Sequence, residues 1–194
     1  IRYAENGQQI DVSDREYFRA ASQGKNFVAE PVISRLDGDL ILVFTVPVYD
    51  DNRAIINVLL ATVEASILSH DIHDIVVGQT GYCYILGLTG TTIATKDFAR
   101  VEKMENVVKM AESDASLKSL ADFENMVLET YESFVGFYEY GGVKKIASYA
   151  TIKTTEWSVI ITTPVDEFMG TVNALRMSMI GIGVIILLIA LVIV

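Results

Sequence analysis

Residues 40–63, LILVFTVPVYDDNRAIINVLLATV, contain the strongest fold signal in the chain. Two runs of apolar and β-branched residues, 40–48 and 54–63, flank Asp50-Asp51-Asn52, which is typical of a turn. Successive positions in both runs are apolar, so we expect both faces of each strand to be covered, as in central strands of a sheet. The stretch therefore predicts two central strands of a compact α/β unit.

The flanking segments complete this unit. In chain order we expect a short strand at 1–5, a helix at 15–21, a strand at 27–34 and a helix at 65–75. Polar side chains at 11–14 are suited to cap the first helix, and Gly24 is placed to end it.

The second half of the chain predicts a similar plan. Strands are expected at 82–88 and 91–95, then a helical region at 98–131, then an antiparallel meander of strands at 134–140, 144–152 and 157–163. One apolar stripe with helical spacing marks the helical region, and Glu124 interrupts it. The stripe consists of Leu117, Leu120, Ala121, Val127, Leu128 and Tyr131. Modules at 1–75 and 76–163 follow from these patterns.

A third segment, 164–194, is expected to be an exit helix. Thr163 can cap it, Pro164 suits its first position, and Asp166 and Glu167 suit its positive end. Residues 177–194 carry no charge, and as a helix they would extend roughly 27 Å, close to the thickness of a bilayer core. The run therefore predicts a transmembrane span, and the charged residues 1–176 would lie outside the cytoplasm.

Composition excludes two classes of protein. The 194 residues are 51% hydrophobic and have a net charge of −10, with 25 acidic and 15 basic side chains. Disordered chains are poor in apolar residues, and nucleic-acid binders usually carry clustered cations, so neither class fits. Cys83 is the single cysteine, which leaves no internal disulfide.

The chain carries no enzyme signature, so we expect no catalytic function and no cofactor. His70, His73 and Asp74 have the spacing that places them on one helical face, where they could in principle bind Zn²⁺. A third strong ligand is not evident, and a solvated helix end with local ion pairs is the competing interpretation. We therefore predict no metal site.

Arg15-Glu16-Tyr17-Phe18 offers a guanidinium followed by two aromatic rings at the start of a helix. Such a group can hold the carboxylate of a small ligand and enclose the rest of it. From spacing alone, core aromatics beside a surface arginine remain an equal alternative.

Four stretches in this order, 11–18, 77–85, 90–94 and 157–161, resemble the double-Cache (dCache_1) extracytoplasmic sensor domain of bacterial and archaeal transmembrane receptors. The resemblance implies an α/β (α+β) fold of two PAS-like modules with antiparallel sheets flanked by helices, followed here by the transmembrane helix. It also implies a homodimer whose ligand binds in the distal module, 1–75.

In the amino-acid-binding subgroup of this family, an Arg-x-Trp-Tyr motif holds the carboxylate and a Pro-Tyr-x-Asp motif with a later Asp holds the ammonium. Arg15 and Pro31 match, whereas Tyr17, Phe18, Val32 and Ser34 replace other motif residues, and Glu64 is the only acid available for the later position. The resemblance thus implies ligand-binding residues Arg15, Tyr17, Phe18, Ser34 and Glu64. Because most of the ammonium site is missing, we expect a ligand with a carboxylate or other anionic group rather than an ordinary amino acid.

These features predict a membrane-bound chemoreceptor that senses an amino-acid-like or carboxylate small molecule and does not bind nucleic acid. Two alternatives are open: the sensor of a histidine kinase or cyclic-dinucleotide enzyme, and an anchored solute-binding module that does not signal.

Overall fold

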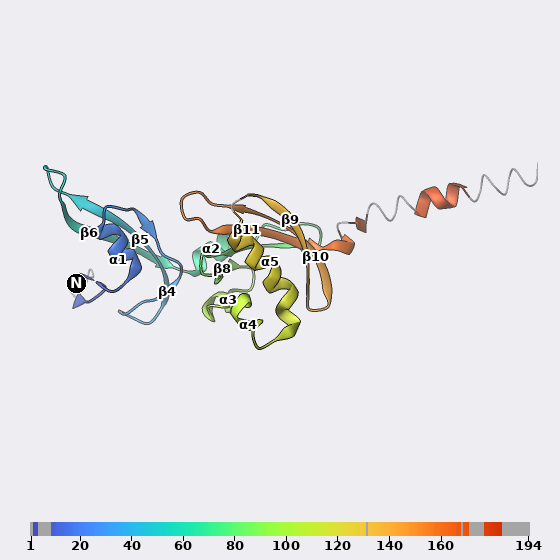
Figure 1. Ribbon diagram of the computed structural model, residues 1–194, viewed down its shortest axis with the longest axis horizontal. Helices are drawn as coiled ribbons and strands as arrows, with labels where there is room; N and C mark the ends of the chain where they lie inside the picture. The colour runs from blue at the N-terminus through green and yellow to red at the C-terminus, as the bar shows by residue number, and fades with distance from the viewer. Residues whose placement is uncertain (1, 4–8, 131, 168, 171–176, 184–194) are drawn as a thin grey trace, which may run out of the picture.

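The structure is a computed structural model, and it describes residues 2–3, 9–130, 132–167, 169–170 and 177–183. A four-stranded and a five-stranded antiparallel sheet dominate it, and helices flank both (Figure 1). A two-stranded pairing of β1 (Arg2–Tyr3) with β2 (Gln9–Ile10) precedes them. The predicted mixture of helices with antiparallel sheets is confirmed.

The four-stranded sheet is centred on β5 (Leu40–Tyr49). Strand β6 (Ile55–Glu64) pairs along the whole of one edge of β5, so β3 (Phe27–Val28) and β4 (Val32–Ile33) share the other edge. The expected strand at 27–34 is therefore two short strands, separated by a segment that ends at Pro31, which has no backbone N–H to donate.

One face of this sheet is covered by α1 (Glu16–Ser22), which packs against β5 and β6. Tyr17 from α1 joins Val12 and Val43 in a buried cluster there. Arg15 is the N-cap of α1, and no side chain caps it, so the predicted capping role of residues 11–14 is wrong. Gly24, with a φ of 88°, follows the end of the helix as predicted.

The prediction that β5 and β6 are covered on both faces holds only for part of β5, where the successive residues Leu42 and Val43 lie on opposite faces and are both buried. Val46 and Leu59 are paired neighbours on the face away from Val43, and they are 39% and 61% exposed. Along the described part of the chain, β6 pairs only with β5 and is an edge strand. Apolar composition shows that a strand can be buried, but covering it requires another element, and α1 lies on the opposite face.

The five-stranded sheet has the order β8-β7-β11-β10-β9. Its strands are β7 (Tyr82–Leu86), β8 (Thr92–Thr95), β9 (Phe134–Tyr140), β10 (Val143–Thr151) and β11 (Ser158–Pro164). Strands β9, β10 and β11 pair antiparallel in sequence order, which confirms the predicted meander. Gly141 and Gly142 both have positive φ in the turn between β9 and β10, a conformation that glycine adopts without strain.

Helices α3 (Phe98–Glu102), α4 (Val107–Met110) and α5 (Lys118–Glu129), with the 3-10 turn η1 (Ala115–Leu117), form the predicted helical region. Leu120, Ala121 and Val127 of α5 are buried in the main core cluster, which confirms the apolar stripe, whereas Tyr131 lies outside the described residues. Glu124, the interruption in the stripe, is also fully buried.

A second core cluster joins the two sheets. Leu42 of β5 packs with Ile85 of β7 and with Trp157, and α2 (Ser66–Ile72) contributes Leu68 and Ile72. Figure 1 shows the four-stranded sheet on one side of the five-stranded sheet and the C-terminal segment leaving on the other. The domain boundaries 1–75, 76–163 and 164–194 remain predictions.

Residues 165–167, 169–170 and 177–183 are helical. Strand β11 continues to Pro164, and the Thr163 hydroxyl donates to the Val77 carbonyl, so Thr163 does not cap this helix as predicted. Of the predicted span 177–194, residues 184–194 lie outside the described part of the chain. Within the described ranges, the helices are too short or too polar to cross a membrane.

Candidate ligand-binding cavity

A cavity of about 560 Å³ lies beside Arg15, where the four-stranded sheet meets loops of the five-stranded sheet. Residues 14–17 and 26–32 form one side of it. The other side comes from Leu88, Thr89, Thr91, Met104 and residues 153–157. Its volume is within the usual range for small-molecule sites, and its position means that a bound molecule would touch both sheets.

Arg15 lines this cavity, and one of its donors is unpaired among the described residues. Its Nη2 donates to the Ile33 carbonyl at 3.1 Å, which fixes the side chain at the edge of the sheet. Its Nε is buried and has no hydrogen-bond partner among the described residues. A buried N–H without an acceptor is costly, and a ligand oxygen that reached it would remove this cost.

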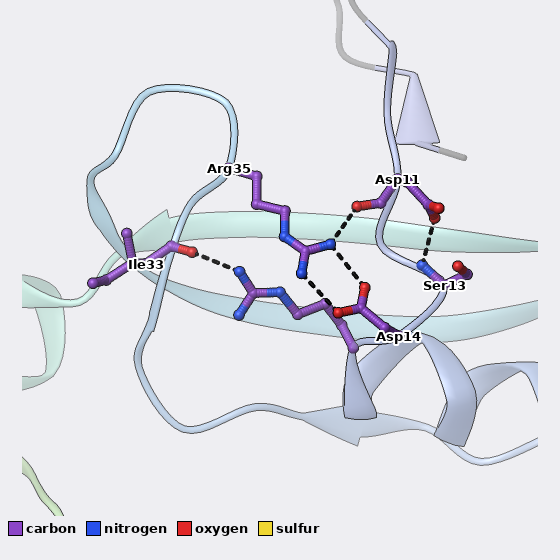
Figure 2. A network of polar contacts seen from close by, with 6 residues as sticks. Asp11, Ser13, Asp14, Ile33 and Arg35 are labelled. Atoms are coloured by element: carbon purple, nitrogen blue, oxygen red, sulfur yellow. Dashed lines mark hydrogen bonds and ion pairs between the residues drawn. The ribbon is translucent and has the colours of Figure 1, made fainter.

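Asp14 does not neutralise Arg15, because Arg35 engages it (Figure 2). Both Nη atoms of Arg35 donate to the Asp14 carboxylate at 2.7 Å, and one also donates to the Asp11 carbonyl. The hydrogen bonds from Arg35 lower the pKa of Asp14 to about 2. Asp14 is therefore charged at neutral pH and paired with Arg35, which leaves the Arg15 guanidinium available to a ligand.

Glu30 connects the cavity wall to the second sheet. Its carboxylate accepts hydrogen bonds from the Thr89 backbone N–H at 3.1 Å and from the Thr89 hydroxyl at 2.6 Å. A Cβ at Gly87 would lie 2.5 Å from this carboxyl group, so the turn approaches Glu30 because Gly87 has no side chain. Sequence reasoning missed Glu30, although its position directly before the motif residue Pro31 was a usable signal.

Two non-glycine residues of the wall have unusual backbone conformations. Met104 and Glu156 have φ values of 50° and 60°, in the left-handed region that such residues rarely adopt. Strained residues of this kind concentrate at functional sites. Trp157 was expected to be a core residue, and it is: it is 5% exposed, packs with Leu42 and also forms part of the wall.

The predicted site residues separate into two groups. Arg15 and Tyr17 both line the cavity. Phe18 packs instead into the core below α1, and Ser34 is buried in a turn where its hydroxyl accepts from the Leu36 N–H. Glu64 is exposed at the end of β6, so β5 separates it from the cavity-lining segment 26–32.

Charged groups of both signs line the cavity. The acids are Asp14, Glu16, Glu30 and Glu156, and the cations are Arg15 and Lys153. Such a wall can accommodate a ligand that carries both a carboxylate and hydrogen-bond donors.

The histidine cluster is solvated. His70, His73 and Asp74 are exposed at the end of α2, and no group of metal-ligating side chains suited to an ion occurs in the described ranges. Cys83 is buried, and burial raises the pKa of its thiol.

The Cache domain family model (dCache_1) matches residues 2–172, so the chain belongs to this family of sensor domains. The matches are to sensor and ligand-binding domains rather than to catalytic ones. A comparison with curated protein sequences gives no match.

Solved structures with the same fold include extracellular domains of receptors. The extracellular domain of mmHK1S-Z3, described as a histidine kinase, superimposes with a TM-score of 0.67 at 13% identity, over 86% of this chain and 60% of that one. The ligand-binding domain of the Pseudomonas aeruginosa PAO1 amino acid chemoreceptor PctB, in complex with L-Arg, gives 0.62 at 20% identity, over 87% and 62%. The ligand-binding domain of the Pseudomonas fluorescens chemoreceptor CtaA, in complex with L-leucine, gives a TM-score of 0.60 at 16% identity, over 81% of this chain and 61% of that one. The chain thus spans about three fifths of the length of these structures.

Proposed function

We propose that the chain is the extracytoplasmic sensing part of a transmembrane chemoreceptor, and that it binds a small carboxylate-bearing molecule in the cavity beside Arg15. The observation that carries this proposal is that Arg15 lines the cavity while its Nε has no partner among the described residues. A guanidinium binds a carboxylate with geometric specificity, and here no protein carboxylate forms an ion pair with it among the described residues.

The other end of the ligand would face the acidic part of the wall. Glu30 is held at a defined position by Thr89, and it can accept hydrogen bonds from a hydroxyl or amine of the ligand. This assigns to Glu30 the role that the sequence had offered to Glu64, which lies elsewhere. The ligand would therefore be anionic at one end and a hydrogen-bond donor at the other.

Transmission would run through the segment after β11 into a membrane span at 177–194, within a homodimer. Glu167 supports a mechanical connection, because its carboxylate accepts from the Gln79 N–H at 2.7 Å and from the Thr80 N–H at 2.9 Å. These bonds tie the start of the exit segment to the turn that precedes β7. Ligand binding would shift the population of two arrangements of this segment.

The test is a thermal-shift screen of the chain against carboxylates, amino acids and hydroxy acids. Saturating ligand at about a hundred times its dissociation constant should stabilise the protein by about 2.7 kcal/mol. Arg15→Ala should abolish the shift, because it removes the only unpaired guanidinium in the wall of this cavity as described.

Arg19→Ala is the matched control, because Arg19 is an exposed arginine on the same helix and does not line the cavity. A ligand whose affinity survives Arg15→Ala would contradict the assignment of the site, and a library without any hit would contradict the binding proposal.

One comparison favours a second kind of receptor. The similarity to the extracellular domain described as part of a histidine kinase supports a sensor kinase as the alternative to a chemoreceptor. Autophosphorylation of the complete receptor in the presence of the ligand, compared with methylation-dependent chemotaxis, distinguishes these two outputs.

A further inference from the structure

Glu124 is a buried carboxyl group that the proposed ligand site does not use. It lies in the middle of α5 and is 0% exposed, within the core between α5 and the five-stranded sheet. Neither of its carboxyl oxygens has a hydrogen-bond partner among the described residues, and the same is true of the buried Tyr84 hydroxyl. Natural cores rarely leave a carboxyl group in this state, so it requires an explanation.

The titratable groups on the packed elements come from several parts of the second half of the chain. Those that are buried or half-buried are Tyr82, Cys83 and Tyr84 of β7, Arg100 of α3, Glu105 in the next loop, Tyr138 and Tyr140 of β9, and Lys145 and Tyr149 of β10. Glu102 of α3, Glu139 of β9 and Lys144 of β10 are exposed. Lys109 of α4 is exposed. Arg100 is the cation whose charge lowers the pKa of Glu124.

Arg100 is already neutralised by another carboxylate. Its Nε donates to Glu105 Oε1 at 2.7 Å, and the two side chains are only 15% and 16% exposed. Lys145 lies over the Tyr82 ring, 4.8 Å from its centroid, and forms no ion pair among the described residues. An ionised Glu124 would therefore be a buried charge without its own counterion.

Burial raises the pKa of Glu124 to about 8, and the attraction of Arg100 only partly opposes this effect. The Tyr84 hydroxyl also acts to lower the pKa of Glu124, although the two groups form no hydrogen bond in this structure. The same burial raises the pKa of Tyr84 itself, so this hydroxyl stays protonated.

We propose that Glu124 is a proton-binding site through which alkaline pH loosens the packing of α5 on the five-stranded sheet, giving the protein a proton input separate from the ligand cavity. With the proton bound, the carboxyl group is neutral and the core is closed. When the proton leaves, the carboxylate must attract Arg100 away from Glu105 or admit water, and both changes move α5 relative to β7 and β9.

The sign of the effect follows from linkage. The pKa of Glu124 is higher in the folded than in the unfolded chain, so the folded state holds more protons between about pH 4.5 and 8. Stability falls as pH rises through this window and levels off above it. If Glu124 dominates, the equilibrium constant for unfolding should increase nearly tenfold per pH unit inside the window.

The experiment is urea unfolding of the 194-residue chain at several pH values between 5 and 9. The Glu124→Gln variant keeps the size of the side chain and cannot ionise, so its unfolding midpoint should not share the loss that the wild type shows as pH rises from 5 to about 8. Glu129→Gln, an exposed glutamate on the same helix, is the control and should follow the wild type. Parallel profiles for wild type and Glu124→Gln would overturn the proposal.

Infrared spectroscopy of the wild type gives a second test that does not require a folded variant. A protonated carboxylic acid has a carbonyl absorption distinct from that of a carboxylate, and this band should be present at pH 6.5 and lost above pH 9. Its absence at pH 6.5 would overturn the proposal. Neither measurement uses a ligand, so a failed ligand screen and a failed proton site are distinguishable.

Discussion

Arg15 and Arg35 lie close together beside α1, and their different partners give them different roles. Arg35 is held by Asp14 and by the Asp11 carbonyl (Figure 2), whereas Arg15 makes one hydrogen bond to a carbonyl and keeps its Nε unpaired. Sequence alone marks Arg15 through its motif, but it does not show that Arg35 removes the competing carboxylate. The pairing of Arg35 with Asp14 is therefore as important for the proposed site as Arg15 itself.

This pairing makes a prediction for Asp14. Arg35→Ala should return the pKa of Asp14 from about 2 towards its ordinary value of 3.8, because the hydrogen bonds from Arg35 are the largest cause of the shift. The pair stabilises the fold fully above about pH 3.8, and this contribution is lost as pH falls through 2. Carboxyl NMR titration measures the shift directly. An unchanged Asp14 titration in Arg35→Ala would refute the pairing.

The contact between Glu30 and Thr89 makes a second prediction. Thr89→Val removes the hydroxyl that donates to Glu30 at 2.6 Å and keeps the volume of the side chain similar. We expect the free energy of unfolding to fall by about 1 kcal/mol, less than the roughly 1.5–3 kcal/mol usual for a bond to a charged group, because the site is exposed. Denaturant titration measures it, with Thr154→Val as the control because no hydrogen bond is described for the Thr154 side chain. Equal stability of the two variants would show that the contact contributes nothing.

At the scale of elements, the exit segment is held by a turn rather than by its own cap. The Glu167 carboxylate accepts three hydrogen bonds, from the Gln79 N–H and from the N–H and hydroxyl of Thr80. The turn comes this close because Gly78 has no side chain: a Cβ there would lie 2.7 Å from Glu167 Oε2. The sequence had suggested that Glu167 acts on the helix N-terminus. The structure instead gives it a connection to the turn before β7, 87 positions away in the chain.

Glu167→Gln should weaken this connection. Hydrogen bonds from Thr80 and Gln79 lower the pKa of Glu167 below 4.5, so the contact is complete above that pH and is lost as the carboxylate becomes protonated at lower pH. At neutral pH the variant should exchange the amide hydrogens of Gln79 and Thr80 faster than the wild type, as measured by hydrogen exchange. Asp166→Asn, an exposed acid beside it, should leave these rates unchanged.

At the scale of the whole molecule, the two sheets share one buried cluster. Leu42 is 1% exposed and packs with residues from the five-stranded sheet, whereas Leu59 on the neighbouring strand is 61% exposed. The cavity lies at the same junction, and Trp157 belongs to both. Occupancy of the cavity can therefore affect how the sheets pack.

Leu42→Ala should destabilise the protein by about 2–5 kcal/mol, as is usual for a leucine removed from a packed core. Leu59→Ala should change stability by only about 0.5 kcal/mol, because the side chain is largely in solvent. The fluorescence of Trp157, the single tryptophan, reports unfolding at the junction directly. Equal losses in the two variants would contradict the junction as described.

The order of helices and strands was largely readable from the sequence, because turn residues, apolar alternation and helical spacing are local. The meander of β9, β10 and β11 and the stripe of α5 are examples. Exposure was harder to predict. The apolar run of β6 resembled a central strand, yet whether a face is covered depends on elements distant in the chain.

The amino-acid sequence by itself was sufficient to indicate the family, the sheet-forming segments and Arg15, because each depends on residue types at fixed spacing. Which other residues take part in the site could not be predicted in this way. Glu30 contacts Thr89, and Arg35 contacts Asp14, only in the folded chain. Glu124 is buried because it lies on the face of α5 that packs against the sheet. These pairings join distant parts of the chain, and burial is a property of the packed molecule rather than of any one segment.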